Sequence, residues 1–139
     1  MDLEDNIDTP MGTYNGAGPL IFSDFSDNLF LATTNKPYAL YRLSQSFSLL
    51  DSVTTLKRKP VALQNLSQNS YALGDSSAVL FFNDNLVLTD SIIFNNGRLY
   101  DMQFSDGYLY AALWLSELSQ TSLIKIDIHD LQYNELISY

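Results

Sequence analysis

The sequence predicts an all-β protein built from three similar four-stranded antiparallel units, and three observations support this fold class. One phrase occurs three times with small changes, as "FSDNLFLAT" (25–33), "LSQNSYALG" (66–74) and "FSDGYLYAA" (104–112). Apolar residues alternate with a period of two in "YLYAAL" and "LIKIDI", which is the period of a strand. Nine Tyr and eight Phe residues supply bulky side chains that suit a pleated sheet.

The repeated phrases predict three equivalent hairpins. Ser26, Ser67 and Ser105 align, and steps of 41 and 38 residues separate them. The residues two positions further on are all types that accept the positive φ of a tight turn. They are Asn28, Asn69 and Gly107.

Strands are predicted on both sides of each turn and twice more in each unit. The first strand is expected at 19–25, 60–66 and 99–104, and the second begins directly after the turn. The third is expected at 38–44, 78–84 and 122–128, and the fourth at 48–53, 87–92 and 134–139. Residues 108–118 could also suit a helix by composition, but the repeat register favours a strand for their first half.

The chain is therefore divided into an arm and three blades. An acidic, glycine-containing N-terminal arm is expected at 1–18, followed by blades at 19–57, 58–96 and 97–139. The stretch "LYDMQFSDGYLYAALW", with "SLIKIDI" after it, resembles the β-propeller repeats of the NHL and YVTN class. In those repeats an inner strand ends in a Ser/Asp-Asp-Gly turn and "LYVA" opens the second strand. The resemblance implies a propeller blade of about 40 residues and no particular family function.

Three blades do not make a closed ring, because propellers contain roughly 4–8 blades. We expect an incomplete ring that is completed by self-association or by partner subunits, and so a homo-oligomer or a subunit of a larger assembly. A longer propeller chain and a closed three-sheet prism are the alternatives. The contact residues are predicted on the first and third blades. They are Phe30, Leu40, Tyr41, Leu109, Tyr110 and Ile124.

Charge and composition exclude several classes of function. The net charge is −9, from sixteen acidic and seven basic residues, so a nucleic-acid partner is not expected. The basic run at 57–59 is interpreted as a solvated loop, with an anion contact as the alternative. One His and no Cys predict neither a metal site nor a cofactor. The acidic N-terminus without an apolar run predicts no Sec signal peptide. No run of ~20 apolar residues is found in the sequence, so no membrane span is expected.

A candidate ligand site lies in the third blade. The stretch "WLSELSQTS" (114–122) lengthens its second hairpin and contains Trp114, the only Trp. With Tyr110 and Glu117, this residue is predicted to contact a carbohydrate or peptide by stacking and hydrogen bonding. The alternative is that Trp114 fills the space between blades.

The function predicted from these observations is non-enzymatic. We expect a structural or adaptor protein whose blades assemble with other subunits, by analogy a virion or phage-tail component. No catalytic residue is expected, because the single histidine, His129, is interpreted as a turn residue. The alternative is a small oligomeric propeller lectin that binds carbohydrate through aromatic residues. The compartment is left open, and a virion or the cytoplasm is favoured over Sec-dependent secretion.

Overall fold

The computed structural model describes residues 20–23, 28–67 and 70–138, which form an all-β structure of three four-stranded antiparallel sheets. The first sheet contains β1 (Leu20–Ser23), β2 (Leu29–Ala32), β3 (Tyr38–Leu43) and β4 (Leu49–Leu56). The second contains β5 (Pro60–Ser67), β6 (Ser70–Asp75), β7 (Ala78–Asn83) and β8 (Leu88–Ile93). The third contains β9 (Arg98–Ser105), β10 (Tyr108–Leu115), β11 (Gln120–Asp127) and β12 (Tyr133–Ser138), with a short 3₁₀ helix, η1 (Ser116–Leu118), between β10 and β11.

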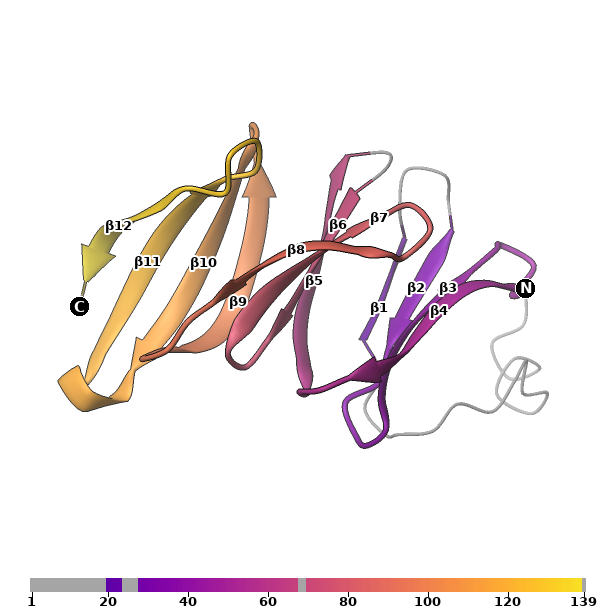
Figure 1. Ribbon diagram of the computed structural model, residues 1–139, viewed down its shortest axis with the longest axis horizontal. Helices are drawn as coiled ribbons and strands as arrows, with labels where there is room; N and C mark the ends of the chain where they lie inside the picture. Colours follow the sequence, from indigo (N-terminus) through magenta and orange to yellow (C-terminus); the bar gives the residue numbers. More distant parts are fainter. Residues whose placement is uncertain (1–19, 24–27, 68–69, 139) are drawn as a thin grey trace, which may run out of the picture.

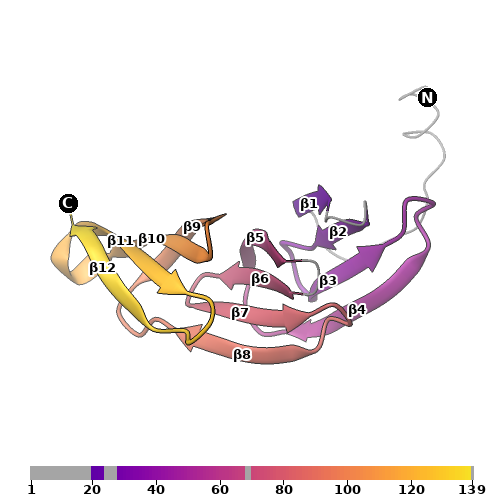
Figure 2. The ribbon, with the colours of Figure 1, turned by 90° about the horizontal axis from the view of Figure 1, so that it is seen from above.

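The predicted fold class is confirmed. The strands run in chain order across each sheet, so every sheet is a simple up-and-down blade. The three blades stand side by side in an arc, with β1, β5 and β9 along one side and β8 and β4 along the other (Figures 1 and 2). The predicted arm at 1–18 and the predicted turn residues Ser26 and Asn69 lie outside the described residues.

Apolar side chains fill the space between neighbouring blades. Between blades two and three, fourteen buried residues pack together, among them Ala72, Phe81, Leu99, Leu109 and Ile126. Between blades one and two, a smaller cluster forms around the rings of Phe30 and Tyr71, whose centroids are 4.5 Å apart. Each blade is thus held to the next by face-to-face packing, the contact on which a propeller depends.

Connections between strands alternate between the two ends of the blades. The connections at 33–37, 57–59, 76–77, 94–97 and 116–119 share one end, at the bottom of Figure 1, which we call the lower end. At the opposite end the β9–β10 turn has positive φ at Asp106 (50°) and Gly107 (83°), as a tight hairpin turn requires. The prediction for Gly107 is therefore confirmed.

The outer strands β4, β8 and β12 form the outer edges of the sheets, and each of them contains one carboxylate. Asp51 accepts a hydrogen bond from Arg42, Asp90 from the backbone of Ser91, and Glu135 from the Ser122 hydroxyl. Within the described ranges, no helix is long and apolar enough to cross a membrane.

One register differs from the alignment of the three hairpins. Aligned on the turns, Phe30 corresponds to Tyr71, which faces blade one. In the structure, Arg42 of blade one pairs with Asp51 on one side and Phe30 on the other. The equivalent residue of blade two, Phe81, pairs with Asp90 and with Ala72. Phe30 therefore corresponds to Ala72 and not to Tyr71. Since a shift of one residue reverses every side chain, Phe30 points toward blade two.

Candidate functional site

Strand β10 presents two chemically different faces. Leu109, Ala111 and Leu113 are buried against blade two. The intervening residues point to the other side, which we call the outer face of blade three. Tyr108, Tyr110 and Trp114 stand in a row there, all half-buried. Strand alternation therefore puts aliphatic residues into the core and aromatic residues onto the outer face.

The outer face continues onto the neighbouring strands through backbone pairing. Leu123 of β11 lies opposite Ala112 on one side and Ile137 of β12 on the other. The Lys125 Nζ lies 3.9 Å from the centre of the Tyr108 ring, a cation–π contact. In the part of the chain that the structure describes, no sheet packs on this face (Figures 1 and 2).

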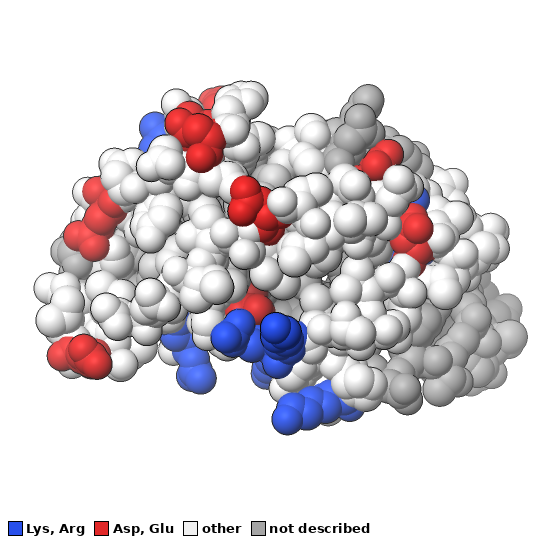
Figure 3. All heavy atoms as spheres, in the orientation of Figure 1, with Lys and Arg blue, Asp and Glu red and all other residues white. Residues whose placement is uncertain are grey.

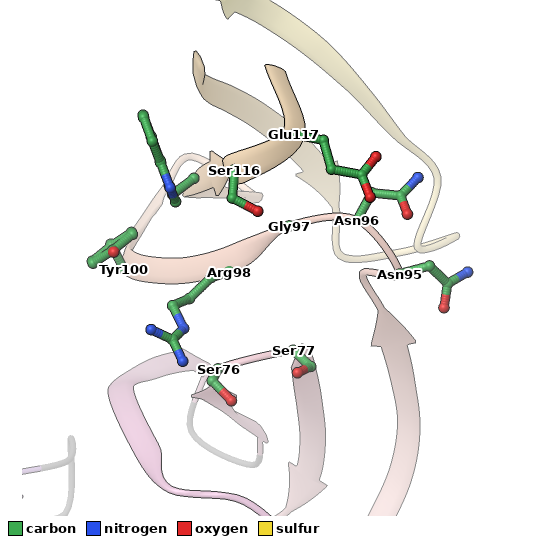
Figure 4. A pocket seen from close by; sticks show the side chains of 10 residues that line it. Ser76, Ser77, Asn95, Asn96, Gly97, Arg98, Tyr100, Ser116 and Glu117 are labelled. Carbon is green, nitrogen blue, oxygen red and sulfur yellow. The ribbon is translucent and has the colours of Figure 1, made fainter. Parts of the chain in front are cut away.

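At the lower end, Trp114 reaches a hollow of about 470 Å³ at the junction of blades two and three. Three connections, the first residues of β9 and Trp114 near the end of β10 form its lining (Figure 4). The lining residues are Ser76, Ser77, Asn95, Asn96, Gly97, Arg98, Tyr100, Trp114, Ser116 and Glu117. In Figure 4, Arg98 points toward Ser76 from one side, and Glu117 points toward Asn96 from the other.

Local features of blade three shape this hollow. A register shift between Ala112 and Leu113 leaves Tyr100 as an extra residue in β9, next to Asp101, which pairs with Ala112. Such a bulge re-aims the side chains near it. The 3₁₀ helix η1 places Glu117 in the lining, and Ser119, the residue after the helix, has a left-handed φ of 51°. The aromatic rings, amides, hydroxyls and one carboxylate of the lining can stack on and hydrogen-bond a polar ring such as a sugar.

The predicted ligand residues separate into two places. Trp114 and Glu117 line the hollow together, whereas Tyr110 lies further along β10 on the outer face. Asn96 of the β8–β9 connection and Arg98 and Tyr100 of β9 were missed, because only the fold brings them to Trp114. One sequence signal did exist: Ser76 aligns with Trp114 in the repeat, and both line the hollow.

The predicted interface residues also separate. Phe30, Leu40, Leu109 and Ile124 are at most 4% exposed and lie in the cores between the blades of one chain. For these four the expected contact with another chain is corrected, because they already face blade two. Tyr41 and Tyr110, both half-buried, point to the opposite faces of blades one and three, away from blade two.

Acidic and histidine side chains are dispersed in the described residues. There, no three His, Asp or Glu side chains come close enough together to hold a metal ion. The backbone N–H of His129 donates to Asp127 Oδ1 at 2.9 Å in the β11–β12 turn.

No protein-family model and no curated protein sequence matches the chain. Solved structures do match. A protein of unknown function from Bacteroides caccae is 14% identical, with a TM-score of 0.60 over 91% of this chain and 48% of that one. BamB from Moraxella catarrhalis is 12% identical, with a TM-score of 0.56 over 84% and 38%. BBS1N, solved in complex with ARL6DN, is 14% identical, with a TM-score of 0.58 over 89% and 36%.

These neighbours are propeller-type proteins, so the predicted resemblance to propeller blades is confirmed. At this identity the likeness shows the fold alone. The chain spans less than half the length of each of the three structures.

Proposed function

We propose that the chain is a non-enzymatic scaffold whose outer blade faces bind further blades, first of all those of a second copy. The observation that supports this most directly is the contrast between the two faces of β10. The face that packs inside the chain is aliphatic, and the outer face carries Tyr108, Tyr110 and Trp114. Tyr and Trp are enriched in protein interfaces relative to the rest of the surface.

The number of blades supports the same proposal. The three blades correspond to 36–48% of propeller-type structures, and two copies of them would supply six blades. A two-fold arrangement places blade three of each copy against blade one of the other and makes that contact twice. If a further blade covered roughly 400 Å² of apolar surface, the contact would contribute on the order of 10 kcal/mol before the costs of association. Partner subunits in a larger assembly are the second form of the proposal, and a virion or phage tail stays a prediction.

The mass of the particle in solution tests the proposal. We expect light scattering to give a multiple of 15.7 kDa for the natural chain. Tyr110→Glu should shift the particle toward the monomer, since it puts a charge into the proposed contact. Gln45→Glu adds the same charge in an exposed β3–β4 connection and should leave the mass unchanged. A cooperative, well-folded natural monomer would overturn the proposal.

Carbohydrate binding is a second candidate function, because Trp114, Tyr100 and Glu117 line one hollow with several amides and hydroxyls. Since Trp114 is the only Trp, its fluorescence reports on this hollow directly. A bound sugar should change the emission, Trp114→Phe should keep stacking, and Trp114→Ala should weaken binding by about tenfold or more. A glycan screen without any Trp114-dependent binding would remove this candidate.

A further inference from the structure

The positive charges of this acidic protein gather at one end. Five of the seven basic residues belong to the connections of the lower end or to the strand start beside them. They are Lys36, Lys57, Arg58, Lys59 and Arg98. In Figure 3 the blue side chains accordingly gather along the lower edge, and most red ones lie above them.

These five residues differ from the other two basic residues in their contacts. Arg42 forms an ion pair with Asp51, and Lys125 lies over the Tyr108 ring. None of the five at the lower end forms an ion pair with another described residue. Like charges repel, so their gathering is unfavourable unless an anion binds among them.

A second hollow opens at this end, with a volume of about 490 Å³. Lys59 and Arg98 contribute the charge, and Thr34, Ser76 and Tyr100 contribute hydroxyl groups. The remaining lining is apolar and includes the buried residues Pro60 and Leu99. The hollow joins residues of all three blades, and no carboxylate is among the described residues that line it.

This combination suits carboxylate groups. A guanidinium binds a carboxylate through two parallel hydrogen bonds, and a lysine adds a point charge. Apolar walls exclude water and strengthen both interactions. Because Lys36 and residues 57–58 extend the charge beyond the hollow, the lower end can bind several carboxylates along one segment. The net charge of −9 opposes a long polyanion such as a nucleic acid more than a short acidic segment, because the repulsion grows with the number of negative charges that the partner brings.

We propose that the lower end binds an acidic polypeptide segment of a protein partner, with one carboxylate held between Lys59 and Arg98. This proposal shares one assumption with the proposed scaffold function, namely that the partner is a protein. It uses a surface separate from the outer blade faces.

Fluorescence anisotropy with labelled hexaglutamate tests it, with hexaglutamine as the uncharged control peptide. We expect the charged peptide to bind, and to bind more weakly as salt rises from about 50 to about 300 mM. Arg98→Gln and Lys59→Gln should each weaken binding by about tenfold. Gln45→Glu lowers the net charge by the same one unit in the exposed β3–β4 connection, at the opposite end of the blades, and should leave binding unchanged. Circular dichroism should show all three variants folded, since the substitutions replace surface side chains.

Three results would overturn the proposal. They are no hexaglutamate binding by the folded natural chain, equal or tighter binding of an oligothymidine, and displacement of the peptide by inorganic phosphate at the same concentration. The two proposals fail separately. A monomer that binds hexaglutamate overturns the scaffold alone, and an oligomer that does not bind it overturns the acidic partner alone.

Discussion

Gly74 illustrates how closely blades two and three approach each other. It lies in β6, and a Cβ atom at this position would collide with the Leu99 side chain and press against Met102. Both neighbours are buried and belong to the cluster between the blades. A glycine is therefore required here by the space between two sheets. Gly107 differs, because a Cβ there would meet nothing within 4 Å and only its φ of 83° favours glycine.

Gly74→Ala should lower the free energy of unfolding by about 1–3 kcal/mol, because Leu99 must move within a packed core. Gly107→Ala should cost about 1–2 kcal/mol through backbone strain alone. Urea unfolding followed by circular dichroism measures both. In a double-mutant cycle, Gly74→Ala and Leu99→Ala together should cost less than the sum of the two single substitutions, whereas Gly107→Ala and Leu99→Ala should be additive. A Gly74→Ala variant as stable as the natural chain would contradict the packing described.

The strands could be predicted from the sequence more fully than their faces. Alternation in "YLYAAL" and "LIKIDI" predicts β10 and β11, and Asp106 with Gly107 predicts the turn before β10. The face of Phe30 could not be predicted, because register depends on the length of the connection. Ser23 pairs with Leu29 across residues 24–28, whereas Ser105 pairs with Tyr108 across 106–107.

The residues of the candidate site could likewise be predicted only in part. The lengthened hairpin predicts Trp114 and Glu117, because its extra residues stand out against the other two repeats. Arg98 and Tyr100 join them through the packing of blade two on blade three and a bulge in β9. Neither cause leaves a local pattern in the sequence.

Two adjacent residues of β11 face opposite sides of the sheet, one toward the core and one toward the proposed contact. Ile124 is 4% exposed and faces blade two, while Leu123 points to the outer face. Ile124→Asp should unfold the chain or destabilise it by about 3–5 kcal/mol, since it buries an unpaired charge. Leu123→Asp should leave the chain folded and reduce its association. Urea unfolding and light scattering distinguish these outcomes, and equal effects of the two substitutions would contradict the assignment of faces.

The whole molecule has charge of opposite sign at its two ends and sheets that are open at their outer edges. Exposed apolar residues lie on the outer strands, for example Ile93 and Leu88, which are 57% and 54% exposed. Such edges can pair with strands of other molecules, and charged side chains on them prevent it. Each outer strand carries one such charge: Asp51 on β4, Asp90 on β8 and Glu135 on β12.

Asp90→Val should therefore promote aggregation, because "LTVSII" would be an uncharged and strand-favouring edge. Thioflavin fluorescence during incubation at 37 °C measures this. Asp84→Val removes the same charge from the β7–β8 connection and should aggregate more slowly. Equal rates would show that net charge, and not its place on the edge strand, keeps the protein in solution.

Carboxylates on the edge strands, together with an outer face that carries aromatic side chains, would give the proposed assembly a preferred direction of growth. In the proposed assembly, the carboxylates on β4, β8 and β12 oppose sideways pairing, and copies add by stacking one blade on the next. A building unit of this kind is divalent, and the rotation between successive blades decides the product. Where the rotations add up to a full turn, growth stops in a ring of defined size. Where they do not, the same contact continues into a filament.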